Sequence, residues 1–128
     1  MDKKELYDSL LEAIDNIESH ILIIVEGKHD IVSLRELNID NSILALEGRP
    51  LYKVVERVVK MQKKVLILVD LDKKGRIIYR YLYHHLTRHG IKVNTVFRDF
   101  LIRKTTIHQI EDIYRYVKKH TLKLRQGL

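Results

Sequence analysis

Acidic side chains follow three apolar segments of this 128-residue chain, and their positions are the first indication of chemistry. Glu26 comes directly after the run ILIIV, while Asp70 and Asp72 come directly after the run VLILV. Glu47 follows a shorter apolar segment. The seven histidines show no metal-ligand spacing, and carboxylates without such partners favour a hard cation, above all Mg²⁺. Because Mg²⁺ commonly takes one or two protein carboxylates together with phosphate oxygens, the pattern predicts a phosphate-containing substrate.

Each of these acids also has a structural interpretation. Glu26 could cap a helix that starts near His29, and aspartates such as those of Asp-Leu-Asp are common in turns. Glu47 lies in Glu-Gly-Arg-Pro, which is a good turn by itself, so we treat it as a second-rank site residue. The combination of Glu-Gly after one apolar strand and Asp-x-Asp-x-x-Gly after another is what favours a site.

Charge is divided unevenly along the chain, whose formal net charge is +7. Residues 1–72 contain 10 Lys/Arg against 14 Asp/Glu, whereas residues 73–128 contain 14 Lys/Arg against 3 Asp/Glu. Segments of one sign favour a polyanion partner, most often nucleic acid, although a solvated basic surface is the simpler alternative. The nucleic acid, RNA or DNA, is expected to contact Lys28, Lys73, Lys74, Arg76 and Arg80.

The elements that must position these residues alternate between strand and helix patterns. Strands without polar alternation, separated by helices of about 10–15 residues, predict an α/β fold with a parallel sheet. We expect four strands, mainly parallel, with helices on both faces. The carboxyl ends of parallel strands are where such folds bind ligands, so the acids should meet there. Strands are expected over 20–25, 43–46, 65–69 and 92–97, and helices over 2–19, 29–37, 50–64, 77–89 and from 106 onwards.

The C-terminal part is expected to begin with a loop, residues 98–105, and to end in a short tail. Between them, Thr106-Ile107-His108-Gln109 resembles a capping box that opens the last helix. We expect one domain, made of an N-terminal helix (1–19), a core (20–97), and a C-terminal loop and basic helix (98–128) packed on or near that core.

Composition excludes several classes of protein. The chain has no cysteine, which excludes disulfides, thiolate zinc sites, iron–sulfur clusters and cysteine nucleophiles, and fits a reducing compartment. The longest apolar runs have five residues, whereas a bilayer needs about 20. We therefore expect a cytoplasmic protein that does not span a membrane.

Two motifs resemble the Toprim domain, which is found in topoisomerases, primases, OLD-family nucleases, recombination-repair proteins and ribonucleases that mature 5S ribosomal RNA. They are VEGKHD, residues 25–30, and LVDLDKKG, residues 68–75. The resemblance covers about residues 20–97, and the whole chain is most similar to small stand-alone Toprim proteins. Receiver and haloacid-dehalogenase-like domains carry their acids after the first strand, so these motifs fit them poorly.

The resemblance implies a Toprim (Rossmann-like) fold and assigns roles to three residues. Glu26 matches the Toprim glutamate, a general acid or base, while Asp70 and Asp72 match the pair that binds Mg²⁺ or Mn²⁺. The implied function is a small metal-dependent nuclease or RNA/DNA-processing enzyme. The alternative is a non-catalytic nucleic-acid-binding module in a repair or ribosome-associated complex. The chain is too short for a topoisomerase or primase, and a protein partner could supply substrate docking.

Overall fold

The computed structural model of the chain describes residues 1–127, and within them it contains one four-stranded sheet. The strands are β1 (Leu22–Val25), β2 (Ile43–Ala45), β3 (Val65–Ile67) and β4 (Val93–Asn94). Their spatial order is β2-β1-β3-β4, and every pairing is parallel. The α/β fold with a parallel sheet that the sequence predicts is confirmed.

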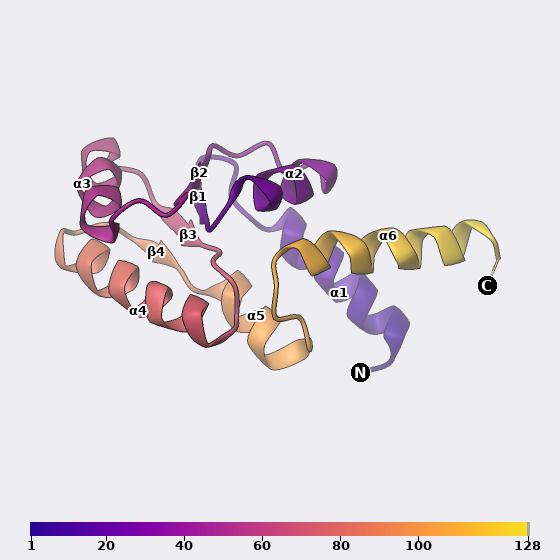
Figure 1. Cartoon of the computed structure of the whole chain (residues 1–128). Coiled ribbons are helices and arrows are strands. Elements are labelled where there is room, and N and C mark those ends of the chain that lie inside the picture. The colour runs from indigo at the N-terminus through magenta and orange to yellow at the C-terminus, as the bar shows by residue number, and fades with distance from the viewer. Residues whose placement is uncertain (128) are drawn as a thin grey trace.

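Six helices cover the two faces of this sheet (Figure 1). In β1, Ile23 and Val25 point to one face and Leu22 and Ile24 to the other, because successive side chains alternate along a strand. The first face packs on α1, α2, α5 and α6, and the second packs on α3 and α4. The helices are α1 (Lys3–Asp15), α2 (Lys28–Glu36), α3 (Leu51–Met61), α4 (Lys73–Arg88), α5 (Val96–Lys104) and α6 (Glu111–Arg125).

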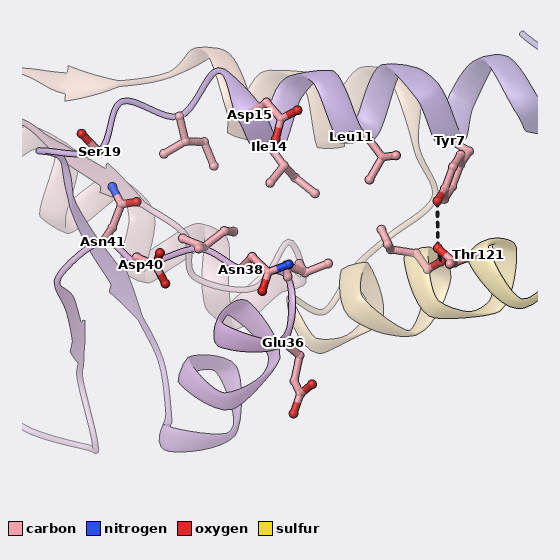
Figure 2. A pocket seen from close by; sticks show the side chains of 14 residues that line it. Tyr7, Leu11, Ile14, Asp15, Ser19, Glu36, Asn38, Asp40, Asn41 and Thr121 are labelled. Carbon is pink, nitrogen blue, oxygen red and sulfur yellow. Dashed lines mark hydrogen bonds between the residues drawn. The ribbon is translucent and has the colours of Figure 1, made fainter.

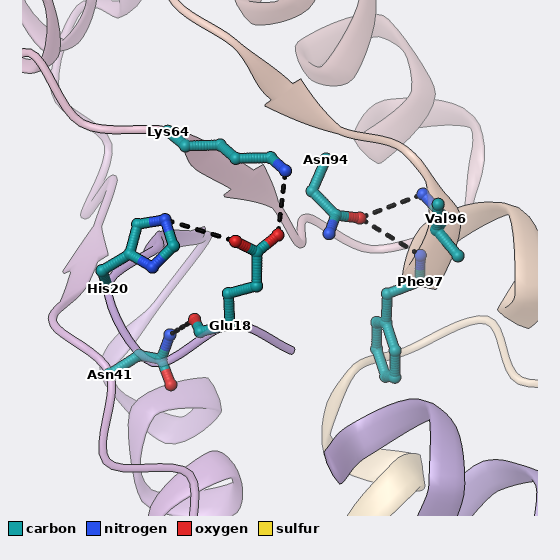
Figure 3. Close-up of polar contacts among 7 residues, drawn as sticks. All are labelled: Glu18, His20, Asn41, Lys64, Asn94, Val96 and Phe97. Atoms are coloured by element: carbon teal, nitrogen blue, oxygen red, sulfur yellow. Dashed lines mark hydrogen bonds and ion pairs between the residues drawn. The ribbon is translucent and has the colours of Figure 1, made fainter. Parts of the chain in front are cut away.

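The prediction of a loop over residues 98–105 is wrong, since α5 occupies Val96–Lys104. Its start is defined by Asn94, whose Oδ1 accepts hydrogen bonds from the backbone N–H groups of Val96 and Phe97 at 3.0 and 3.4 Å (Figure 3). The strand predicted over residues 92–97 is shorter in the structure, because only Val93–Asn94 pair with β3. Phe97, Arg98 and Leu101 then form the buried side of α5.

The capping box expected at residues 106–109 is also absent from the described structure. The Oγ1 atom of Thr105 accepts from the N–H of Ile107 at 3.1 Å, and α6 begins only at Glu111. The first helix is shorter than expected, ending at Asp15 rather than residue 19. At the C-terminus α6 continues to Arg125, and of the expected tail residue 128 lies outside the described residues.

The loop that follows α1 is fastened to the amino end of the sheet. The Nζ atom of Lys64 donates to Glu18 at 3.0 Å, and Asn41 Nδ2 donates to the backbone carbonyl of Glu18 at 2.8 Å (Figure 3). The same Asn41 amide donates to the carbonyl of Ile21 at 2.9 Å. These bonds fix the start of β1, and therefore the position of its carboxyl end, where Glu26 lies.

None of the helices in residues 1–127 is long and apolar enough to cross a membrane.

Candidate metal and nucleic-acid site

Glu26 lies immediately beyond β1 and points across the carboxyl edge of the sheet to β3. Its Oε2 atom accepts a hydrogen bond of 2.9 Å from the backbone N–H of Asp70. The side chain is only 19 % exposed. Because β1 and β3 are adjacent and parallel, two motifs that are 44 residues apart in sequence meet directly. The expected convergence of Glu26 with the Asp-x-Asp segment is therefore present.

The two aspartates beyond β3 are held by different parts of the chain. Asp70 Oδ1 accepts from the backbone N–H of Ile110 at 2.9 Å. Asp72 is the N-cap of α4, and its Oδ1 accepts from the backbone N–H of Gly75 at 2.8 Å. Between them, the N–H of Leu71 donates to the carbonyl of His108 at 2.7 Å. The segment that precedes α6 thus runs along the Asp-x-Asp turn and fixes its shape.

Gly75 is required by the close approach of α4 to the end of β3. A Cβ atom at this position would lie 1.8 Å from the carbonyl oxygen of Asp70 and 2.6 Å from its carbonyl carbon. Both contacts are with backbone, which cannot rotate away as a flexible side chain can. The Gly of the Asp-x-Asp-x-x-Gly motif therefore lets the first turn of α4 place its N–H on Asp72.

Glu26, Asp70 and Asp72 share one arrangement. One oxygen of each accepts a backbone N–H, and the other accepts no hydrogen bond from the residues that the structure describes. Hard carboxylate oxygens with one lone-pair face left open are suitable donors for Mg²⁺ or Mn²⁺, with phosphate and water completing the shell. Among residues 1–127, however, no group of three or more histidine or carboxylate side chains is arranged to hold a metal by itself.

Burial raises the pKa of Glu26 above its ordinary value. The hydrogen bond from Asp70 N–H and the charge of Lys74 act in the opposite direction, while the carboxylates of Asp70 and Asp72 raise this pKa further. A carboxyl group with a raised pKa exchanges its proton closer to neutral pH, which is what general acid–base chemistry requires.

Asp30, one turn into α2, is a fourth acid near the same edge. Its Oδ2 atom accepts from the backbone N–H of Gly27 at 3.1 Å, which orders the turn that follows Glu26. Its pKa is raised, first by burial and then by the charges of Asp70 and Glu111. Asp30 belongs to the motif VEGKHD, but it is not among the site residues predicted from the sequence.

Arg98 lies on α5, beneath the site. The sequence pattern predicts a loop at this position. Arg98 is 3 % exposed, and its guanidinium donates to the backbone carbonyls of Val69 at 2.6 Å and Asp70 at 3.2 Å. The same group lies 4.4 Å from the ring centroid of Tyr79 on α4. Burial lowers the pKa of Arg98, whereas Tyr79 and the carboxylates of Asp70 and Glu26 raise it. Arg98 therefore ties the end of β3 to α5 and places positive charge below the acids.

The predicted basic residues differ in their distance from the acids. Lys74 Nζ lies 4.0 Å from Glu26 Oε1, and both line a hollow of ≈ 230 Å³ together with Arg49. Arg49 was not predicted. The structure gives no side-chain contact that links the remaining predicted cations to the acids, and all of them are exposed. They are Lys28 at the start of α2, and Lys73, Arg76 and Arg80 on α4.

Glu47 is exposed and lies in a turn with a positive φ of 52°. Its backbone N–H donates to the carbonyl of Glu26 at 3.0 Å, so the turn adjoins the site, but its carboxylate makes no hydrogen bond or ion pair with the residues described. A larger cavity, ≈ 580 Å³, lies elsewhere, between α1, α2 and α6 (Figure 2). None of the predicted site residues lines it. The acids that the sequence singles out therefore lie at the carboxyl edge of the sheet and not in this larger cavity.

Comparison with known proteins agrees with this geometry. Residues 23–101 match the Toprim-like family, and this segment contains Glu26, Asp70, Asp72 and Arg98. The chain therefore belongs to the Toprim-like family, which associates it with metal-dependent nucleic-acid chemistry.

Its similarity to individual proteins extends over almost the whole chain. It is 32% identical to a UPF0292 protein of Methanocaldococcus jannaschii, covering 93% of this chain and 98% of that protein. It is 33% identical to a UPF0292 protein of Pyrococcus abyssi, covering 93% and 89%. A solved structure of a protein from Aquifex aeolicus has a TM-score of 0.64 and 31% identity, and covers 85% of this chain and 95% of that chain. The names of these relatives specify no activity.

Proposed function

We propose that this chain is a metal-dependent nuclease that hydrolyses phosphodiester bonds in RNA or DNA. In this reaction water attacks phosphorus, the bond from phosphorus to the leaving sugar oxygen breaks, and the leaving oxygen gains a proton. Glu26 would take the proton from the attacking water or give one to the leaving oxygen, for which its raised pKa is suited.

Asp70 and Asp72 would hold Mg²⁺ or Mn²⁺ through the oxygens that their backbone hydrogen bonds leave open. When bound, the metal would supply positive charge at the phosphate and so stabilise the charge that develops there. Lys74 and Arg49 line the hollow beside Glu26 and would bind a phosphate oxygen. Lys28, Lys73, Arg76 and Arg80 would contact the flanking backbone.

The observation that carries the proposal is the fixation of three carboxylates by backbone N–H groups at one sheet edge. A module that only binds nucleic acid gains nothing from carboxylates placed beside phosphate, because they repel it. The alternative is a non-catalytic module in a repair or ribosome-associated complex. The basic second half of the chain is equally expected under both functions and does not separate them.

A cleavage assay separates the two. The purified chain, with and without Mg²⁺ or Mn²⁺, is incubated with labelled structured RNA, single-stranded DNA and duplex DNA. We expect metal-dependent cutting of at least one substrate, and a loss of about 10²-fold or more in Glu26→Gln. The matched control is Glu56→Gln on the exposed side of α3, which should cut at the wild-type rate.

The aspartates are tested by asparagine variants, which can still accept the N–H groups of Ile110 and Gly75. Mg²⁺ should raise the melting temperature of the wild type but not of Asp70→Asn/Asp72→Asn. An equal rise in both proteins would contradict the assigned metal ligands. Binding without cutting, identical in wild type and Glu26→Gln, would overturn the nuclease and favour the binding module.

A further inference from the structure

A second basic region lies at the other end of α6, where this helix passes the start of α1. There a hollow of ≈ 270 Å³ is lined by Lys3, Lys4, Tyr7, His120, Lys123 and Leu124, a set that we call the basic hollow. Figure 1 shows α6 extending away from the sheet, with α1 crossing it and both termini on this side. Three lysines from two helices, 120 positions apart in sequence, thus share one depression.

Aromatic rings pack beside the basic hollow. His120 packs against Tyr116 with the two rings tilted and their centroids 4.2 Å apart, and it stacks on Tyr7 with centroids 5.7 Å apart. The hydroxyl of Tyr7 lies 2.8 Å from Thr121 Oγ1, which joins α1 to α6 (Figure 2). The hydroxyl of Tyr116 donates to the carbonyl of Lys3 at 3.4 Å. Packing between the two helices therefore fixes the rings and the backbone that carries the lysines.

Positive charge in the basic hollow is not neutralised. Among the described residues, no ion pair involves Lys3, Lys4, Lys119 or Lys123. The pKa of His120 is lowered by burial and then by the charges of Lys123, Lys3 and Lys119. Of the nearby acids, Asp2 accepts the N–H of Glu5 at 2.8 Å, and Glu5 is exposed. Three neighbouring ammonium groups without carboxylate partners favour a phosphate ligand.

We infer that the basic hollow is a second binding site for nucleic-acid phosphate, separate from the acidic edge of the sheet and joined to it by α6. The inference rests on the proposed function for its ligand, since the nucleic acid bound here is the one that would be cut at Glu26.

The length of α6 sets the spacing between the two sites. The residue before this helix, Ile110, donates to Asp70, and the 13 steps from Ile110 to Lys123 rise about 20 Å along α6 at 1.5 Å per residue. At about 3.4 Å per base pair, this distance corresponds to roughly six base pairs. A longer nucleic acid can therefore be held by the basic hollow while its scissile phosphate lies at the acids.

The test compares two triple variants that remove equal charge. Lys3→Gln/Lys4→Gln/Lys123→Gln neutralises the basic hollow, and Arg57→Gln/Lys60→Gln/Lys63→Gln neutralises exposed cations on and just after α3. The probe is a fluorescein-labelled DNA duplex of about 20 base pairs, long enough to cover both sites, and a single-stranded RNA of the same length. Fluorescence anisotropy gives the binding constant at several salt concentrations.

On the duplex, we expect the slope of log K against log salt to become shallower by about 2 to 3 in the hollow variant, since each lost phosphate contact removes about 0.9. A smaller change of about 0.7 for each contact is expected on single strands. The α3 variant should keep the wild-type slope. Equal slopes in the two variants would overturn the inference.

A second measurement is made on the wild type, with one substitution used only to assign signals. The ring signals of His120 in the wild type are titrated by NMR with and without the probe duplex, and are assigned with His120→Gln. Bound phosphate offsets the lysines, so we expect the pKa of His120 to rise when the duplex is present. An unchanged pKa at saturating duplex would contradict binding in the hollow.

Failure of the nuclease proposal can be told apart from failure of this one. If the wild type cuts nothing, the salt slopes and the His120 titration still decide whether the hollow binds. If cutting is confirmed, the hollow variant should need a higher duplex concentration for half-maximal cutting than the α3 variant, while Glu26→Gln should keep the wild-type salt slope and lose cutting.

Discussion

The acidic edge of the sheet and the basic hollow are built in opposite ways. At the acidic edge, the backbone N–H groups of Asp70, Ile110 and Gly75 each hold one carboxylate oxygen. In the basic hollow, Lys3 and Lys123 are exposed and their ammonium groups make no hydrogen bond or ion pair with the described residues. Metal binding and proton transfer need carboxylate oxygens at fixed positions, whereas a lysine ammonium group can bind phosphate from many directions. The carboxylates at the acidic edge are thus held by backbone hydrogen bonds, as the proposed chemistry requires, whereas the lysines of the basic hollow are not.

The cations of the chain show the same contrast. Arg98 is buried and its fork reaches two carbonyls, those of Val69 and Asp70. Arg76 and Arg80, which lie on α4, are exposed. A planar guanidinium with fixed donors can hold backbone in place, which a flexible ammonium does less well. Arg98 therefore holds the backbone of Val69 and Asp70 at the acidic edge.

The largest effect is expected from Gly75→Ala, which should disrupt the acidic edge and leave the basic hollow intact. Its new Cβ atom would collide with the carbonyl of Asp70, so the turn or α4 must shift. We expect a loss of about 3 kcal/mol in the free energy of unfolding, at the upper end for overpacking, measured by urea denaturation. Gly27→Ala is the control, since no atom lies within 4 Å of its added Cβ.

The Gly75→Ala variant also tests the comparison between the two regions. Metal-dependent cutting should be lost, while the salt dependence of binding at the basic hollow should persist below the melting temperature. A variant as stable and as active as the wild type would contradict the close approach of α4 to β3.

A smaller effect is expected from Arg98→Ala, which leaves the carbonyl of Val69 without its buried partner. We expect a loss of about 2 kcal/mol, because an unsatisfied buried acceptor costs about 1–3 kcal/mol. Arg98→Lys should recover only part of it, since one ammonium cannot reproduce the fork. The exposed Arg103→Ala, also on α5, is the control, with a change within about 0.5 kcal/mol.

If Arg98 positions the acids, its alanine variant should also weaken the stabilisation by Mg²⁺ that melting experiments measure, and Arg98→Lys should partly restore it. An Arg98→Ala protein with reduced stability but an unchanged response to Mg²⁺ would limit Arg98 to a packing role.

The smallest effect is a pH dependence at Glu26. Its pKa is raised in the folded chain, so the protonated form stabilises the fold at low pH, and this contribution is lost as the pH rises through the folded pKa. Glu26→Gln mimics the protonated side chain. We therefore expect it to melt a few degrees above the wild type at neutral pH, with the difference shrinking below the ordinary glutamate range.

Melting temperatures of the wild type, Glu26→Gln and Glu56→Gln are measured across this pH range, the last giving the baseline for an exposed glutamate. A difference that grows as the pH falls would contradict the raised pKa of Glu26.

The two central strands could be predicted because ILIIV and VLILV are apolar throughout and are followed by turns. With parallel pairing, this pattern predicts that Glu26 lies beside Asp70, and the hydrogen bond between them agrees. Helix α5 could not be predicted in the same way, since RDFLIRKT has no clear apolar period and Asn94 fits either a strand or a cap.

The groups that hold the site residues in place could not be predicted from the sequence, because they are backbone N–H groups and a buried charged side chain. Nothing in the residue type of Ile110 indicates that its N–H would hold Asp70. A buried Arg98 also looks the same in a sequence as an exposed arginine, and only the packing of α5 under β3 tells them apart. The assignment of Asp70 and Asp72 to metal stays a prediction.

The bond between Asp70 and Ile110 joins residues 40 positions apart, and this separation has a consequence for synthesis. A ribosome completes β1, β3 and all three principal carboxylates long before it reaches residues 108–110. A nascent chain can therefore pair β1, β2 and β3 while the Asp-x-Asp turn still lacks the segment that shapes it. The order of translation makes the acidic edge one of the last parts of the protein to mature.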